Sequence, residues 1–143
     1  MTTRHFALVF GVTFLLVGIA GFIPGLTQMP HAQHPQLQVD AYYGLLFGLF
    51  PVNALHNLVH LLFGVWGVAA YYGLGGARLY ARGVAIGYAV ATIAGFVPGL
   101  DTGFGLVPLF GNDIWLHALL ALAGAYFGWV HRDRPAETII PAA

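Results

Sequence analysis

The chain has 143 residues, of which 59% are hydrophobic and only 7% are charged. Soluble domains carry about 25% charged residues, so this chain cannot cover itself with a hydrated surface, and we expect an integral protein of the lipid bilayer. Its five arginines balance five acidic residues, which excludes the basic patch that a nucleic-acid partner needs. The absence of cysteine excludes disulfides, thiolate metal sites and thiol catalysis.

Four apolar stretches are long enough to cross a bilayer, which takes roughly 20 helical residues. In chain order they are residues 5–24, 52–73, 79–100 and 113–131. No A-x-A-like cleavage site follows the first stretch, so we interpret it as a helix and not as a signal peptide. The fold class predicted is all-α: a polytopic membrane protein with four transmembrane helices in a single domain over residues 1–143.

The connection between the first two spans, residues 25–51, is the longest one. It begins with the polar, Pro-punctuated sequence TQMPHAQHPQLQ, which is typical of an exposed loop. The following DAYYGLLFGLF, residues 40–50, is too short to cross a bilayer, and we expect it to lie in the membrane interface or to re-enter partway.

All basic side chains lie on one side of this topology. They precede the first span, occupy the turn between the second and third, and follow the fourth: Arg4, Arg78, Arg82, Arg132 and Arg134. By the positive-inside rule, we predict a multi-pass protein of the cell membrane with both termini cytoplasmic, including a tail over residues 132–143.

Two short sequences recur along the chain. IAGFIPGL at 19–26 returns as IAGFVPGL at 93–100, and GLFP at 48–51 returns as GLVP at 105–108. The offsets are 74 and 57 residues, and the difference is extra loop in the first half. We therefore predict two helical-hairpin repeats.

The first repeat covers residues 4–73 with its longer outer loop 25–51, and the second covers residues 78–131. Each repeat contains two spans, so both insert in the same direction. Parallel repeats of this kind are related by a pseudo-two-fold axis along the membrane normal.

Polar residues interrupt the second and fourth spans at matching heights. His56 and His60 lie one helical turn apart, and the offset of 57 matches them to Asp113 and His117. Small residues continue the same helix faces, which indicates that these faces point into protein and not into lipid. We expect the four side chains near the outer mouth of the bundle, supported by the polar residues Asn53, Asn57 and Asn112.

Three interpretations of this cluster remain open. In the first it is structural: Asn53, Asn112 or Asp113 caps a helix, and the histidines hydrogen-bond across helices. The protein is then a small non-enzymatic structural or accessory membrane subunit, acting as a homo-oligomer or with a membrane-complex partner. No nucleotide-binding loop, serine nucleophile elbow or H-E-x-x-H motif is present, which also favours a non-enzymatic role.

In the second interpretation the cluster holds a cofactor. His56, His60, Asp113 and His117 suit a zinc, copper or non-haem iron ion. Alternatively, His60 and His117 are axial ligands of a haem or hold a pigment. His31 and His34 in the outer loop are candidates to complete such a site, although ordinary solvated loop residues explain them as well.

The third interpretation is a proton relay or small transporter that acts as an oligomer. The sequence offers no ionisable residue that continues the path from His60 or His117 toward the arginines, which weakens a full crossing.

The chain resembles a bacterial family of small four-helix membrane proteins known as domain of unknown function 4383. Three stretches carry the resemblance: FALVFGVTFLLVGIAGFIPG, LFPVNALHNLVHLLFGVWG and LVPLFGNDIWLHALLAL. It covers most of residues 4–130, with the sequence around His56, Asn57 and His60 as its most specific part. The resemblance implies the topology and a bacterial membrane, and it supplies no activity.

Overall fold

Four helices dominate the computed structural model, which describes residues 1–73 and 76–133. They are α1 (Thr3–Ala20), α2 (Ala54–Tyr71), α3 (Ala77–Phe96) and α4 (Asn112–Ala125), which continues as one π-helical turn, η2 (Tyr126–Val130). By length and composition all four, with η2 counted as part of the fourth, can cross a membrane. This confirms the predicted fold class. Residues 134–143 of the predicted tail, with Arg134, and residues 74–75 of the turn before α3 lie outside the described residues.

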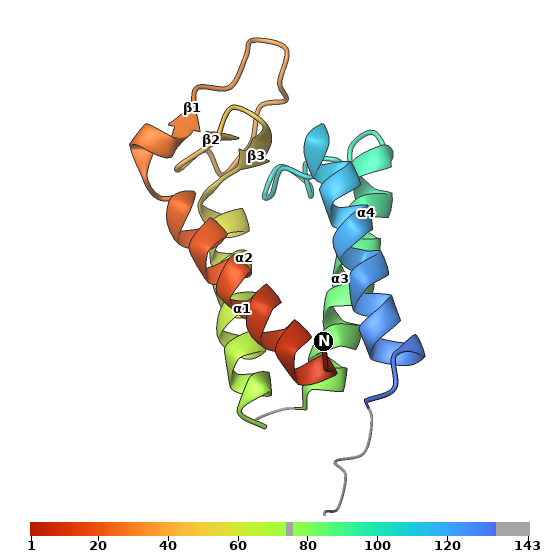
Figure 1. Ribbon diagram of the computed structural model, residues 1–143. Helices are drawn as coiled ribbons and strands as arrows, with labels where there is room; N and C mark the ends of the chain where they lie inside the picture. The colour runs from red at the N-terminus through yellow and green to blue at the C-terminus, as the bar shows by residue number, and fades with distance from the viewer. Residues whose placement is uncertain (74–75, 134–143) are drawn as a thin grey trace, which may run out of the picture.

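The helices form two hairpins that stand beside one another (Figure 1). α1 packs mainly along α2, and α3 mainly along α4. The hairpins also meet through α1 with α3 and α2 with α3. We call the end of the bundle that carries residues 21–53 and 97–111 the loop end. The opposite end, with the N-terminus and residues 131–133, is the terminal end.

Two of the predicted spans are four residues too long at the loop end. α1 ends at Ala20 and α3 at Phe96, whereas the apolar stretches continue to 24 and 100. Each helix is followed by a Pro-Gly pair, Pro24-Gly25 or Pro98-Gly99. Proline disfavours helical backbone at the residue before it, so hydropathy alone overestimates the helix.

A small antiparallel sheet covers the loop end of the first hairpin. Its strands are β1 (Thr27–Gln28), β2 (Gly44–Leu46) and β3 (Phe50–Val52), in the order β1-β2-β3. The β2–β3 connection contains Phe47 and Gly48 in left-handed backbone conformation (φ 54° and 73°). The sequence predicts an interfacial or re-entrant segment for residues 40–50 and gives no indication of strands there. Strands of two or three residues are too short to show an alternating pattern.

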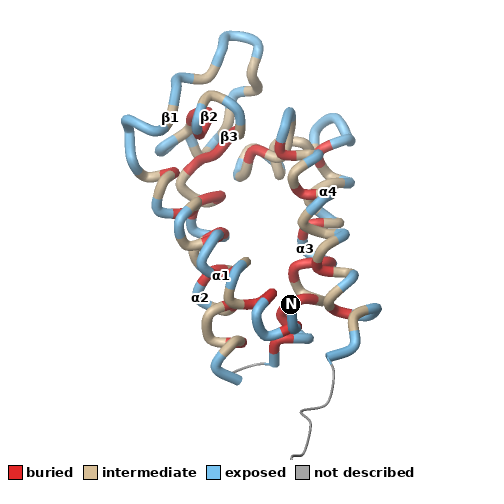
Figure 2. Tube along the Cα trace, viewed as in Figure 1, coloured by how far each residue is buried: buried red, intermediate tan, exposed pale blue. Residues whose placement is uncertain are grey.

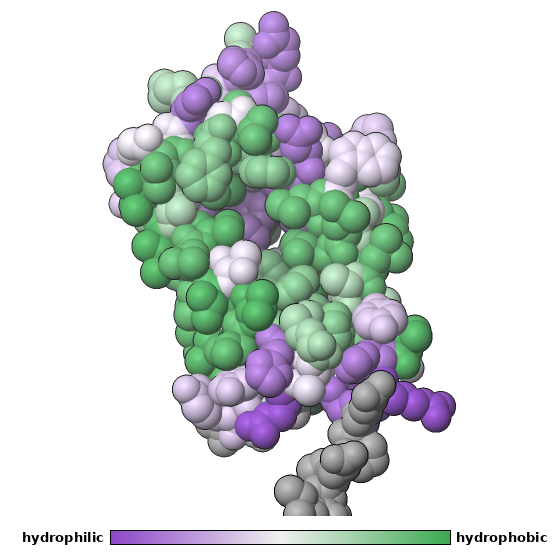
Figure 3. Space-filling view, viewed as in Figure 1, coloured by the Kyte–Doolittle hydropathy of each residue, from purple (hydrophilic) through white to green (hydrophobic). Residues whose placement is uncertain are grey.

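Burial separates the inward from the outward faces of the helices (Figure 2). Buried residues at the hairpin interface include Phe6, Phe14, Tyr80, Val84 and Tyr88. Large apolar side chains cover the outside, with Leu62 70% and Leu122 68% exposed. Figure 3 shows the result as an apolar surface between hydrophilic ends. Such an exposed apolar belt requires lipid around it, and the protein is therefore membrane-embedded.

Glycines let the two helices of each hairpin approach closely. A Cβ built on Gly67 of α2 lies 2.7 Å from Cα of Gly11 and 2.8 Å from the Ala7 carbonyl oxygen in α1. A Cβ on Gly124 of α4 lies 2.7 Å from the Ala85 nitrogen and 2.8 Å from the Ala81 carbonyl oxygen in α3.

These contacts join residues that the two sequence offsets match. Ala7 and Gly11 correspond to Ala81 and Ala85, and Gly67 corresponds to Gly124. Phe47 and Gly48 likewise correspond to Phe104 and Gly105, and all four have positive φ. The agreement supports the predicted repeat; its pseudo-two-fold axis stays a prediction.

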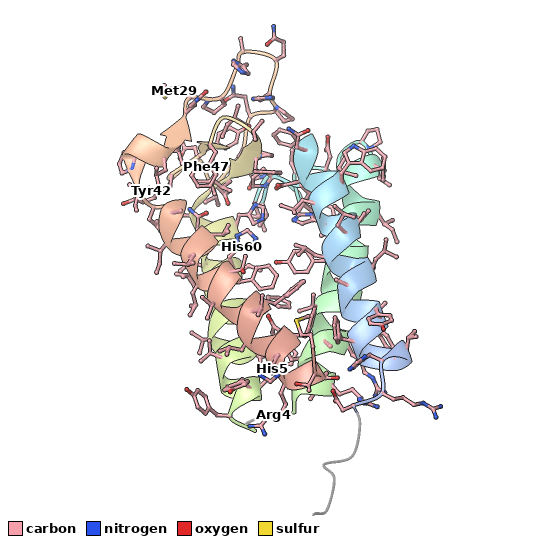
Figure 4. The ribbon with its side chains drawn as sticks, viewed as in Figure 1. Arg4, His5, Met29, Tyr42, Phe47 and His60 are labelled. Atoms are coloured by element: carbon pink, nitrogen blue, oxygen red, sulfur yellow. The ribbon has the colours of Figure 1, made fainter. Side chains whose placement is uncertain are left out.

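Arginines satisfy helix carbonyl groups at the terminal end, where Figure 4 labels Arg4 and His5. Arg4 donates from Nε and Nη2 to the Tyr71 carbonyl oxygen at the end of α2 (2.9 and 2.7 Å). Arg82 donates from Nε to the Gly128 carbonyl oxygen (3.0 Å) at the end of the fourth span. Cations near helix C-termini are also favoured by the helix dipole.

Candidate metal centre

The four predicted site residues are buried inside the loop-end half of the bundle. His56 and His60 on α2 and Asp113 and His117 on α4 are each no more than 6% exposed. Figure 4 shows His60 between the two hairpins. The side chains therefore face protein and not lipid, as the small residues on the same helix faces predict.

Asn53 fixes the start of α2 and with it the position of His56. Its Oδ1 accepts a hydrogen bond from the backbone N–H of His56 (2.9 Å), which is the N-cap interaction predicted from the sequence. Its Nδ2 donates to the carbonyl oxygens of Val39 (2.8 Å) and Leu106 (2.7 Å). One buried side chain thus joins α2 to both loops of the loop end.

The start of α4 is built differently. Its N-cap residue is Gly111, at φ 68°, and no side chain caps this helix. The prediction that Asn112 or Asp113 caps α4 is therefore wrong: both lie inside the helix, and Asn112 donates from Nδ2 to the Leu49 carbonyl oxygen (3.2 Å). The Asp113 carboxylate is left free for another role, in a first turn where the helix dipole stabilises negative charge.

His56, Asp113 and His117 converge. One ligand atom from each lies within 4.8 Å of the others, and His56 Nδ1 is 3.7 Å from Asp113 Oδ2. Metal–ligand bonds of about 2.0–2.2 Å place tetrahedral ligand atoms about 3.4 Å apart. Small side-chain rotations are enough to close the group around one ion.

His60 stands beside this group and not in it. Its ring centroid is 4.6 Å from that of His56, and its other face stacks on Phe14 (5.7 Å, 13°). Phe14 stacks in turn on Tyr88 (5.4 Å, 7°), which contacts His117 (5.1 Å). Phe14 and Tyr88 thus link the rings of His60 and His117 through a chain of aromatic contacts. Among the described residues the group that brings ligand atoms together is His56, Asp113 and His117, which fits a metal ion, and a haem or pigment held by His60 and His117 stays a prediction.

The polar atoms of the cluster have no hydrogen-bond partner among the described residues. They are Nδ1 of His56, His60 and His117, Oδ2 of Asp113 and Oη of Tyr88. A buried polar group without a partner costs about 1–3 kcal/mol, and such groups are rare in native proteins. These atoms are therefore free to bind an ion or water at this place.

The remaining polar candidates lie outside this group. Asn57 is fully buried against Gly21 of the first hairpin, and neither atom of its amide has a partner in the described structure. His31 and His34 lie near one another in the outer loop (ring centroids 5.3 Å apart), and His34 contacts Phe110 just before α4 (5.5 Å).

Sequence reasoning did not identify Phe14 and Tyr88 as walls of the site. A signal was present, because the offset of 74 residues matches Phe14 to Tyr88, as the offset of 57 matches His60 to His117. In each hairpin an aromatic residue of the first helix packs on the histidine of the second.

Fold and site together define a small polytopic membrane protein with a buried cluster of metal-ligand residues between two helical hairpins. The family model described as "Domain of unknown function (DUF4383)" matches residues 4–130, and the chain belongs to this family. Neither the curated proteins nor the solved structures contain a match to the chain.

Proposed function

We propose that this protein binds one transition-metal ion inside the membrane, through His56, Asp113 and His117. The observation that carries the proposal is that three buried residues each bring one ligand atom within 4.8 Å of the others. His56 Nδ1, His117 Nδ1 and Asp113 Oδ2 also have no hydrogen-bond partner among the described residues. Ionisable residues at this depth are costly in a bilayer and are retained where they serve a function.

Two imidazoles and one carboxylate restrict the choice of ion. Zinc sites with three protein ligands keep a fourth position open for water or substrate. Two histidines and one carboxylate with open positions also form the usual site of non-haem iron(II), and copper accepts the same donors. Rotation of His60 toward its neighbour His56 provides a further imidazole for an ion that needs four protein ligands.

The structural interpretation has less support. It expects the histidines to bond across helices, yet Nδ1 of His56, His60 and His117 has no hydrogen-bond partner among residues 1–73 and 76–133. A proton relay is not favoured either. From the cluster toward the terminal end, the described core is aromatic and aliphatic, with residues such as Phe6 and Val84, and the single hydroxyl of Tyr80 does not form a continuous path.

The proposed setting is the cell membrane, with the terminal end in the cytoplasm. Arg4, Arg78 and Arg82 lie at that end, as does Arg132, and the loop end of the chain contains no arginine or lysine. The metal centre then lies in the outer leaflet, near the external surface.

Metal analysis of the detergent-purified protein tests the proposal. We expect one equivalent of zinc, iron or copper, lost in His56→Ala and His117→Ala. His31→Ala in the outer loop is the matched control and keeps the metal. Wild-type protein that binds no ion after dialysis against each metal, or that loses the ion equally in His31→Ala, contradicts the proposal.

A second candidate, an accessory subunit that docks on another membrane helix, has one specific observation in its favour. A shallow surface groove of about 300 Å³ between α3 and α4 is lined largely by small residues, Ala85, Ala89, Ala121 and Ala125. Small residues favour close helix contacts in membranes. Crosslinking from cysteines placed at Ala89 and Ala125 should capture a second copy or a partner helix; a strictly monomeric protein in bilayers excludes this role.

A further inference from the structure

A cavity of about 240 Å³ adjoins the proposed metal centre, between α2 and α3. His56 and His117 form part of its wall together with Tyr88. The rest of the wall is apolar or glycine: Val59, Phe63, Gly87, Ala91, Val107 and Leu109. The imidazoles that we assign to the metal thus also face a space with mostly apolar walls.

The rim of this cavity reaches the lipid-facing surface. Val59 on α2 is 41% exposed, and Gly87 on α3 is also exposed, in the part of each helix that crosses the membrane. Gly87 has no side chain to close the rim, and a Cβ there meets only the Phe63 ring, at 3.4 Å. A molecule dissolved in the bilayer can therefore approach the cluster sideways.

Hydrogen bonds join the two loops on the aqueous side of the cluster. Backbone N–H groups of Gln38 and Val39 donate to the Gly105 carbonyl oxygen (2.8 and 3.2 Å), which joins the two loops above the cluster. The Asn53 amide holds the same loops from below.

The cavity wall also suggests which molecules fit. The Tyr88 hydroxyl is a buried donor without a partner, and a three-ligand metal site leaves a coordination position open. An oxygen atom of a ligand can accept a hydrogen bond from this hydroxyl and also fill the open coordination position. The apolar walls suit a ligand with a hydrocarbon body. We propose that the cavity binds a lipid-soluble molecule whose hydroxyl, carbonyl or carboxyl head group reaches Tyr88 and the metal, a proposal that rests on the metal-binding function above.

Photolabelling in lipid nanodiscs tests this inference. The probe is a ten-carbon alcohol with a diazirine next to the hydroxyl, and the labelled peptides are mapped by mass spectrometry. We expect saturable labelling of Val59–Phe63 and Gly87–Ala91. Gly87→Leu should reduce it about tenfold, since a steric penalty of about 1.4 kcal/mol changes affinity by that factor. Excess decanoic acid and a short-tailed benzoquinone, added separately, distinguish carboxyl from carbonyl head groups.

Val90→Leu, on the lipid-facing side of α3 and outside the cavity, is the matched control and should label like wild type. Ala91→Leu fills the same cavity if Gly87→Leu fails to fold. Metal content is measured on the same samples. Retained metal with labelling that ignores both cavity variants, or that spreads evenly over lipid-facing residues, overturns this inference alone. Saturable labelling of a metal-free wild type overturns the metal proposal and leaves the cavity.

Discussion

The two hairpins use the same contacts to hold their helices together and different residues to build the site. In the first hairpin, Gly67 packs against Ala7 and Gly11. In the second hairpin, Gly124 packs in the same way against Ala81 and Ala85. Each hairpin also packs an aromatic ring on a histidine, Phe14 on His60 and Tyr88 on His117. The two hairpins thus share both the close helix contact and the aromatic–histidine contact.

The differences lie at the loop end, where the chemistry is. His56 in the first hairpin corresponds to Asp113 in the second, and these unlike residues approach to 3.7 Å. The like residues His60 and His117 each contact His56 (ring centroids 4.6 and 5.8 Å apart), and only His117 joins it in the candidate ligand group of the described residues. In the predicted repeat, the two hairpins share their helix contacts, and the difference at one matched position supplies the carboxylate of the proposed site.

The largest loss of stability is expected on replacing the glycines that hold the helices of each hairpin together. Gly67→Val and Gly124→Val should each lower the free energy of unfolding in detergent micelles by about 3 kcal/mol, because either side chain forces a tightly packed helix pair apart. Gly87→Ala is the control, since its Cβ meets only the Phe63 ring, and it should be near neutral. A large effect at one glycine and none at the other would show that the hairpins are not equivalent.

Replacing the asparagine at the start of α2 or of α4 should lower the free energy of unfolding by smaller and unequal amounts. Asn53→Ala removes an N-cap and two hydrogen bonds to loop carbonyls, and we expect a loss of about 2 kcal/mol. Asn112→Ala removes one exposed hydrogen bond and should change stability by less than about 0.5 kcal/mol. Equal losses in the two variants contradict the difference in capping.

The matched aromatic pair allows an exchange experiment. Tyr88→Phe removes a buried hydroxyl that has no partner, so metal-free, delipidated protein should gain about 1 kcal/mol of stability. Phe14→Tyr adds a second such hydroxyl and should lose a similar amount. A loss in Tyr88→Phe instead means that the hydroxyl is already satisfied.

The smallest effect concerns the terminal end, where Asp133 accepts a hydrogen bond from the Thr3 backbone N–H (2.8 Å). Partial burial raises the pKa of Asp133, but the bonds from Thr3 and the nearby His131 outweigh it, so this pKa lies below its usual value. Its contribution to stability is then present above the unfolded pKa, about 3.9, and is lost as the pH falls through the lower folded value.

Asp133→Asn should therefore slightly lower stability at pH 7 and flatten its decline in acid, an effect that salt weakens because the group is partly exposed. Asp40→Asn, at the exposed loop end, serves as control. Identical pH profiles for wild type and Asp133→Asn contradict the assigned role.

The sequence is sufficient for the four spans and the burial of the polar faces, since these depend on hydropathy and helical spacing. It is not sufficient for how far along their axes α2 and α4 meet. His56 and His60 share one helix face and lie about 6 Å apart along it, so this position decides that His56, and not His60, meets Asp113 and His117. The sequence also does not predict the loop-end sheet. Its short strands are held by pairing between residues that are distant in the chain, such as Thr27 with Leu46 and Gly44 with Val52.

X-ray absorption spectroscopy of the metal-loaded protein is the most direct measurement of the proposed centre. We predict a first shell of light N/O donors at about 2.0–2.2 Å whose outer-shell scattering corresponds to two imidazoles, unchanged in His60→Ala and reduced to one in His117→Ala. Scattering without an imidazole contribution, or loss of one imidazole on replacing His60 but none on replacing His117, contradicts a site built from His56, Asp113 and His117.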